Sequence, residues 1–250
     1  MPINHIFLVI ATALTLSSCA NKHLSKHFTV ESQSIEMTLD TGASTSLLPL
    51  SYTPQSSKAS EVYFLDRNLS LKKGNITFIS EDQSVDSPCI FTNGLKQNAV
   101  AGLPLLRKLS PIILDSKNQS PKNTFHLQTS LIHNFPLIPC EVDSKPFYLL
   151  LDTGSLRSVL SSSSIYKKRG NLRSIWKDTP ASQVSIGSNR INLPKELPPL
   201  KGSYSVFHVP HLKRITTHDN REVIGLLGLD YILKHVTKID LQNNTITTHY

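Results

Sequence analysis

The sequence predicts an all-β fold built from two similar halves. Short runs of β-branched and aromatic residues recur between turn-forming residues, whereas alanine and glutamate are sparse, and this composition favours strands over helices. The 250 residues are 39% hydrophobic and 18% charged, which is ordinary for a globular protein large enough to bury a core. The triplet Asp-Thr-Gly occurs twice, each time after an apolar run. Together these observations predict two related β lobes.

Residues 1–18 have the properties of a secretion signal. They contain no Asp, Glu, Lys or Arg, and the apolar stretch Ile6–Leu16 is too short to span a bilayer comfortably. The segment ends in Leu-Ser-Ser-Cys, which resembles the lipobox of bacterial lipoproteins and implies that Cys19 becomes the lipidated first residue of the mature chain. The alternative is an ordinary signal peptide that leaves Cys19 as a plain thiol, because no Lys or Arg precedes the apolar stretch.

A lipid on Cys19 would make residues 19–27 a membrane tether and place the protein in the cell envelope. Ala20 stands where lipoproteins retained at the inner membrane commonly carry an aspartate, so the expected location is the periplasmic face of the outer membrane. Cys89 and Cys140 would then remain as an even pair in an oxidising compartment. They form either a disulfide or two buried thiols, because the sequence does not show whether their Cα atoms lie within about 7 Å.

The composition argues against several classes of partner. The net charge of +8 suits attraction to anionic lipid surfaces or acidic partners, although solubility alone also accounts for it. No arginine-rich cluster or row of aromatic residues indicates nucleic acid. His208, His211 and His218 lie near one another in sequence but lack the acidic or His-Glu-x-x-His context of a zinc site. No metal and no cofactor is expected.

The chain repeats itself around Asp40 and Asp152, which lie 112 residues apart. Each aspartate is expected to follow one apolar strand and to precede another, at 34–39 and 46–50 in the first half and at 146–151 and 158–162 in the second. A hairpin-like segment follows in each half, with Gly74 34 residues after Asp40 and Gly187 35 residues after Asp152. Glycine at a hairpin tip supplies the positive φ that tight turns need.

A third pair of similar segments closes each half. Residues 99–115 and 225–241 both consist of an apolar run, a glycine, a leucine, a short helical run and a strand that ends near an aspartate. The interval from aspartate to this glycine is longer in the second half, which indicates an insertion, placed here near the proline-rich loop 193–202. We expect an N-terminal lobe over 28–128 and a C-terminal lobe over 129–250.

This duplicated pattern resembles the aspartic protease clan, in which an Asp-Thr-Gly-[Ser/Ala] turn and a later apolar-apolar-glycine segment mark each lobe. The resemblance covers nearly everything from Phe28 to Tyr250. It implies two retropepsin-like β-barrel lobes related by a pseudo-twofold axis, with an active-site cleft between them. Because both lobes lie in one chain, the molecule would be its own dimer, and we expect a monomer with an internal pseudo-dimer.

The resemblance implies that Asp40 and Asp152 are the catalytic pair. Two carboxylates a few Å apart cannot both ionise easily, so they hold one proton between them and can act as base toward water and as acid toward a carbonyl oxygen. The pair should titrate as a unit. The threonine hydroxyls of Thr41 and Thr153 are expected to hydrogen-bond across the lobe interface.

The other turn residues have implied supporting roles. Gly42 and Gly154 would let the backbone approach the carboxylates. At the fourth position Ala43 resembles the retropepsin pattern and Ser155 the pepsin-like pattern. A serine hydroxyl there can donate to a carboxylate of the pair, which predicts that Ser155 supports one aspartate in a way that Ala43 cannot. The segments around Gly74 and Gly187 would be flaps over the cleft, although the first lacks the tyrosine of a pepsin-type flap.

The sequence therefore predicts an aspartic-type endopeptidase anchored at the cell envelope, with a protein or peptide substrate. The alternative is a catalytically inactive two-lobed lipoprotein that binds a peptide or an envelope polymer, against which both complete triplets count. A weaker alternative makes one aspartate a phosphoryl acceptor, but the duplicated layout and the absence of a Mg²⁺-site motif oppose it.

Overall fold

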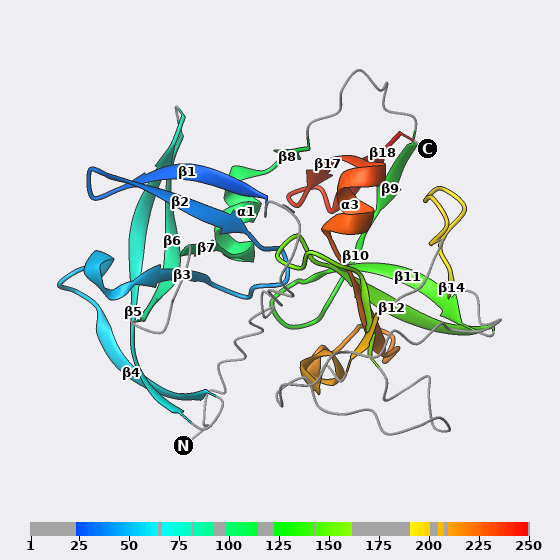
Figure 1. Cartoon of the computed structure of the whole chain (residues 1–250), viewed down its shortest axis with the longest axis horizontal. Helices are drawn as coiled ribbons and strands as arrows, with labels where there is room; N and C mark the ends of the chain where they lie inside the picture. Colours follow the sequence, from blue (N-terminus) through cyan, green and yellow to red (C-terminus); the bar gives the residue numbers. More distant parts are fainter. Residues whose placement is uncertain are drawn as a thin grey trace.

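The structure is a computed structural model that describes residues 24–64, 67–81, 83–92, 99–114, 123–142, 144–161, 191–200, 205–207 and 210–249. It is mostly β, with one closed barrel and two open sheets (Figure 1). The expected signal peptide, Cys19 and Gly187 lie outside the described residues. Residues 24–27, assigned above to the tether, already belong to the fold, because the first strand begins at Ser25.

A closed, six-stranded mixed barrel forms the N-terminal half. Its strands follow the order β1-β2-β7-β3-β6-β5, and a pairing of β1 with β5 closes the ring, while β4 extends the sheet beyond β5. Their bounds are β1 (Ser25–Val30), β2 (Gln33–Leu39), β3 (Ser46–Pro49), β4 (Lys58–Phe64), β5 (Arg67–Ser80), β6 (Gln83–Thr92) and β7 (Ala99–Ala101). A 3₁₀ turn, η1 (Leu50–Tyr52), follows β3, and helix α1 (Leu103–Leu109) follows β7.

The C-terminal half contains an open sheet with the same path of connections. Its order is β10-β11-β12-β16-β13-β15, and β14 pairs with β11. The parallel pair β12–β16 and the antiparallel pair β16–β13 repeat β2–β7 and β7–β3 of the barrel. The bounds are β10 (Gln128–Thr129), β11 (Pro136–Val142), β12 (Lys145–Leu151), β13 (Val159–Ser161), β14 (Ile191–Asn192), β15 (Ser205–Phe207) and β16 (Val223–Leu227).

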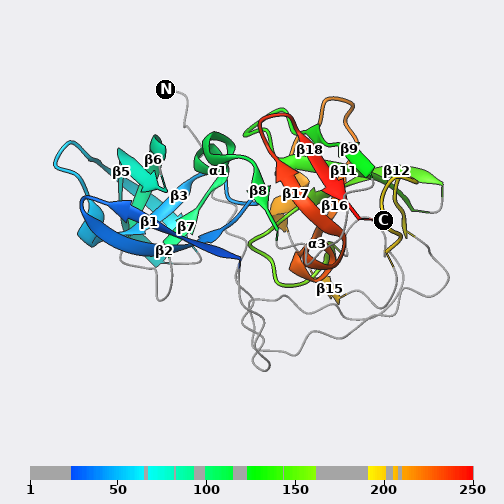
Figure 2. The same cartoon turned by 90° about the horizontal axis from the view of Figure 1, so that it is seen from above.

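A third, four-stranded sheet combines strands from both halves of the sequence. Its order is β8-β17-β18-β9, so that β8 and β9 flank the two last strands of the chain (Figure 2). The bounds are β8 (Ile112–Ile113), β9 (Asn123–His126), β17 (Val236–Asp240) and β18 (Thr245–Thr248). Helix α3 (Leu229–His235) precedes β17, and a 3₁₀ segment, η2 (Pro210–Arg214), precedes β16.

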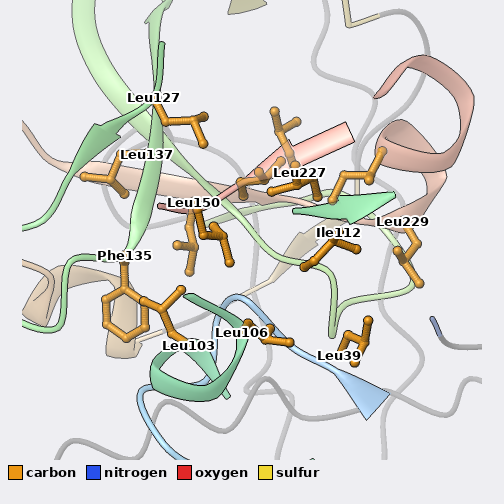
Figure 3. Packing of buried hydrophobic residues seen from close by; sticks show 14 of the residues in the cluster. Leu39, Leu103, Leu106, Ile112, Leu127, Phe135, Leu137, Leu150, Leu227 and Leu229 are labelled. Atoms are coloured by element: carbon orange, nitrogen blue, oxygen red, sulfur yellow. The ribbon is translucent and has the colours of Figure 1, made fainter. Parts of the chain in front are cut away.

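One buried apolar cluster runs through both halves. Leu103 and Leu106 of α1 belong to it together with Phe135 and Leu150 from the second half, and Figure 3 shows these side chains converging. Arg107 strengthens this junction, because one guanidinium nitrogen donates to the carbonyl of Asn134 at 2.7 Å. The two halves therefore pack as one body through α1.

The expected fold is confirmed at the level of a mostly β protein with a barrel in its first half. A second closed barrel is not seen among the described residues, where the C-terminal sheet stays open. Strand β10 spans the expected lobe boundary at 128/129 and pairs with β11. In the described part of the chain, no helix has the length and apolar character needed to cross a bilayer.

Candidate active site

Asp40 and Asp152 each stand at the end of a buried strand, β2 and β12. The backbone N–H of Asp40 donates to the carbonyl of Ala101 at 3.0 Å, and that of Asp152 donates to Leu227 at 2.9 Å. Ala101 and Leu227 end the parallel neighbour strands β7 and β16. The same backbone bond therefore fixes the start of both turns.

The two threonines join the turns by four reciprocal hydrogen bonds. The N–H of Thr41 donates to Oγ1 of Thr153 at 3.0 Å, and the N–H of Thr153 donates to Oγ1 of Thr41 at 3.1 Å. Each hydroxyl then donates across the junction, from Thr41 to the Leu151 carbonyl at 2.6 Å and from Thr153 to the Leu39 carbonyl at 2.7 Å. Both threonines are completely buried. These bonds make each turn a structural support of the other.

The glycine of each turn lies against the carboxylate of the other turn. A Cβ atom added to Gly42 would come within 2.8 Å of Cγ of Asp152, and one added to Gly154 would come within 2.3 Å of Cγ of Asp40. Real Cβ atoms do not approach other heavy atoms so closely. The two aspartates therefore meet because both turns carry glycine at the contact.

Each carboxylate is held by the backbone of its own turn. Oδ1 of Asp40 accepts from the N–H of Gly42 at 2.8 Å, and Oδ1 of Asp152 accepts from Gly154 at 2.9 Å and from Ser155 at 3.2 Å. Oδ2 of Asp152 is buried and has no hydrogen-bond partner of good geometry in the described part of the protein. The N–H groups of the Asp152 turn therefore hold Oδ1 and leave Oδ2 unbonded by that turn.

Burial raises the pKa of both carboxyls. For Asp40 the charge of Asp152 and the direct interaction with its carboxyl raise the pKa further, so that it stands well above its usual range. For Asp152 the interaction with the Asp40 carboxyl and the N–H donors of its own turn lower the pKa again in part. Because the two carboxyls are in contact, they share one proton and titrate as a unit.

The expected role of the Ser155 hydroxyl is wrong. Its Oγ donates to the carbonyl of Arg157 at 2.8 Å, away from the carboxylates, whereas its backbone N–H supports Asp152. The turn itself explains this geometry, since the carbonyl two residues ahead lies within reach of a short hydroxyl side chain. The Ser155 hydroxyl therefore gives Asp152 no hydrogen bond that the Ala43 side chain denies to Asp40.

Gly74 does not lie at a hairpin tip. It pairs with Cys89 in the middle of the long strand β5, whereas the antiparallel pairing of β4 with β5 runs from Lys58 and Lys73 to Phe64 and Arg67. The backbone is closely packed there, because an added Cβ would come within 3.3 Å of Cγ of Pro54 and that ring would have to shift slightly. A flap in the first half would therefore be the β4–β5 hairpin, with Gly74 at its base; Gly187 falls outside the described residues.

Two serines behind the turns are part of the site and are missing from the sequence-based set. Oγ of Ser46 accepts from the N–H of Gly102 at 3.0 Å, and Oγ of Ser158 accepts from the N–H of Gly228 at 3.1 Å. Each serine lies six residues after its aspartate and begins the apolar run that follows it. That equal spacing was the available signal.

Cys89 and Cys140 are two buried thiols and do not form a disulfide. Cys89 in β6 and Cys140 in β11 are buried free thiols, and burial raises the pKa of each to about 12. They are therefore protonated at ordinary pH and unsuited to act as nucleophiles. Among the described residues, no group of three or more His, Cys, Asp and Glu side chains is placed to hold a metal ion.

Comparison with known proteins adds no identity. No protein-family model matches the chain, and no curated protein matches its sequence. Two buried carboxyls in contact that share one proton can supply an acid and a base to the same small group of atoms.

Proposed function

We propose that this chain is an aspartic-type endopeptidase that hydrolyses peptide bonds with water activated between Asp40 and Asp152. The observation that carries the proposal is the reciprocal contact of the two turns, in which each glycine lies against the carboxylate of the other turn. A single Asp-Thr-Gly turn needs no such partner. Two buried acids brought into contact are costly for folding and useful for acid–base chemistry.

Within a pair that shares one proton, we assign the starting role of base to Asp152 and that of acid to Asp40. Asp152 takes a proton from water, whose oxygen attacks the carbonyl carbon of the scissile bond. Asp40 gives its proton to the carbonyl oxygen, which yields a tetrahedral gem-diol. The proton on Asp152 then passes to the leaving nitrogen as the carbon–nitrogen bond breaks, and the remaining hydroxyl proton returns to Asp40. No metal and no covalent intermediate is required.

The same proposal includes two retropepsin-like lobes related by a pseudo-twofold axis, in a monomer whose halves act as a dimer. Support comes from the repeated strand order around each aspartate and from the reciprocal bonds between Thr41 and Thr153. The substrate would lie in a cleft between the lobes, with hairpin β4–β5 as the flap of the first lobe. The expectation of a protein or peptide substrate rests on the same arrangement.

A digest of a peptide library tests this function. The full-length chain, purified in detergent, is incubated with the library from acid to neutral pH, and the products are read by mass spectrometry. We expect internal cleavages that are absent from Asp152→Asn. Peptides that bind without being cut at any pH would instead support the inactive binding lipoprotein.

We further propose that the protein is anchored in the bacterial cell envelope through a lipid on Cys19, on the periplasmic face of the outer membrane. The carbonyl of Leu24 accepts from the N–H of Leu39, the residue before Asp40, at 2.8 Å. Leu24 follows Cys19 by five positions, so the lipid-bearing residue lies at most about 17 Å of chain from this fixed point. Cys19→Ser should release the protein from membrane fractions or block its maturation. Unchanged fractionation, together with an N-terminal peptide of unmodified mass, would refute the anchor.

A further inference from the structure

The two catalytic turns are supported by matching bonds from behind, except at one position. In each half a leucine follows the glycine of the closing segment, and its N–H donates to the carbonyl of the fourth turn residue at 2.8 Å. Leu103 donates to Ala43, and Leu229 donates to Ser155. The serine–glycine bonds described above also match. The next residue breaks the symmetry, because it is Pro104 in the first half and Asp230 in the second.

Asp230 makes a compact set of contacts to the second turn. Its Oδ1 accepts from the N–H of Ser158 at 2.8 Å, from the hydroxyl of Ser158 at 2.7 Å and from the N–H of Tyr231 at 2.9 Å. Its own N–H donates to the carbonyl of Leu156 at 3.3 Å. Pro104 has neither a carboxylate nor an N–H with which to make these bonds. The second turn is therefore held at more points than the first.

The carboxylate also orients the Ser158 hydroxyl. Since that hydroxyl donates to Asp230, its lone pairs are left to accept from Gly228. Gly228 in turn packs on the turn backbone, where an added Cβ would lie 2.5 Å from the carbonyl carbon of Arg157 and 2.8 Å from the carbonyl oxygen of Ser155. In the first half the corresponding hydroxyl, that of Ser46, lies against the thiol of Cys89, a weaker partner.

We propose that Asp230 is a positioning residue that fixes the Asp152 turn through Ser158 and Gly228, so that the Ser155 N–H stays on the Asp152 carboxylate. This inference rests on the proposed function, in which Asp152 is the base that must face the water. Asp230 is exposed and touches neither carboxylate of the pair. Its effect is therefore on the position of the Asp152 turn, not on the protonation of Asp40 and Asp152.

The test compares Asp230→Ala with Asp230→Asn, because asparagine keeps an oxygen that accepts from the same donors. On a peptide that the full-length chain cleaves, we expect Asp230→Ala to lower kcat about tenfold with KM within about twofold, since misplacement of a reacting group acts on the chemical step. Asp230→Asn should stay within about twofold of wild type. Asp219→Ala is the matched control, because Asp219 lies in the same half and is bonded to Tyr148 and Arg221 instead.

Amide hydrogen exchange supplies a readout that does not need activity. In Asp230→Ala, peptides that cover Ser158 and the Asp152 turn should exchange faster, while those that cover the Asp40 turn should not change. If the wild-type chain cleaves nothing, the proposed function fails and the exchange comparison still decides the role of Asp230. Should Asp230→Ala not fold, Ser158→Ala breaks the same link and takes its place, with Ser46→Ala as its counterpart in the first half.

Three results would overturn the proposal. They are unchanged exchange around Ser158 in Asp230→Ala, a kcat within about twofold of wild type, and an Asp230→Asn variant as impaired as Asp230→Ala. The last would mean that the negative charge, not the hydrogen-bond acceptor, matters at this position.

Discussion

Thr41 and Thr153 each accept the backbone N–H of the other through their hydroxyl oxygens, at 3.1 and 3.0 Å. Two residues 112 positions apart thus make the same bond in both directions. Because each hydroxyl also donates to the strand that carries the other turn, neither turn can keep its shape alone. The site is a property of the pair of halves.

Removing either threonine hydroxyl should destabilise the whole protein. Thr41→Val and Thr153→Val keep the side-chain shape but leave a buried N–H and a buried carbonyl unpaired, and we expect each to lower the free energy of unfolding by about 2 to 4 kcal/mol. Urea denaturation measures this, with Thr→Ser at each position as the control that keeps the hydroxyl. Valine variants as stable as wild type, or a large effect at only one position, would contradict a reciprocal support.

The glycines of the two turns should differ in their tolerance of alanine. An added Cβ at Gly154 would lie 2.3 Å from Cγ of Asp40, and one at Gly42 would lie 2.8 Å from Cγ of Asp152. Both substitutions must push the carboxylates apart, and Gly154→Ala must push further. We expect loss of cleavage in both and a larger loss of thermal stability in Gly154→Ala, measured by calorimetry. The reverse order of stability would count against this packing.

Stability should fall as the buried pair ionises. Burial and the neighbouring Asp152 raise the pKa of Asp40 well above its unfolded value. Between the unfolded and the folded pKa the folded state binds more protons than the unfolded state, so the protein loses stability as pH rises through this range. The contribution is fully present only below the unfolded pKa, near pH 4. Asp40→Asn, which cannot ionise, should therefore be more stable than wild type at neutral pH, with the difference vanishing below about pH 4. Melting temperatures of both forms across pH test this, and parallel curves would refute it.

Ser155→Ala should leave the pH dependence of cleavage unchanged. Ser155 supports Asp152 through its backbone N–H, which alanine retains, while its hydroxyl donates to Arg157. The measurement is kcat/KM against pH for both forms on one peptide. A profile displaced toward neutral pH in the variant would restore the hydroxyl role that the sequence suggested.

The strands around the site were predictable because apolar runs and turn residues repeat on both sides of each aspartate. The expected strand at 146–151 corresponds to β12, and the closing segments correspond to β7–α1–β8 and β16–α3–β17. The β1–β2 hairpin was not predictable, because Glu31 and Ser32 form its two-residue turn with positive φ values of 48° and 66° instead of the usual Asn-Gly.

Gly74 shows why a single residue type misleads. Glycine serves both positive φ and close packing, and at position 74 only the neighbouring Pro54 reveals which need applies. Asp230 shows the opposite limit, because its role depends on a bond to Ser158 across 72 residues of sequence. Comparing the halves letter by letter shows that Pro104 and Asp230 differ, but only the contacts show what the difference does.

The most direct measurement of the central claim is kcat/KM for Asp40→Asn, Asp152→Asn and the double variant on a peptide cleaved by wild type. Circular dichroism and a cooperative unfolding transition in urea would show that each variant is folded. If the two carboxyls act as one acid–base unit, each single substitution lowers kcat/KM by about a thousandfold or more, and the double variant is no worse than either single one. Cleavage within tenfold of wild type in either single variant would contradict the shared dyad.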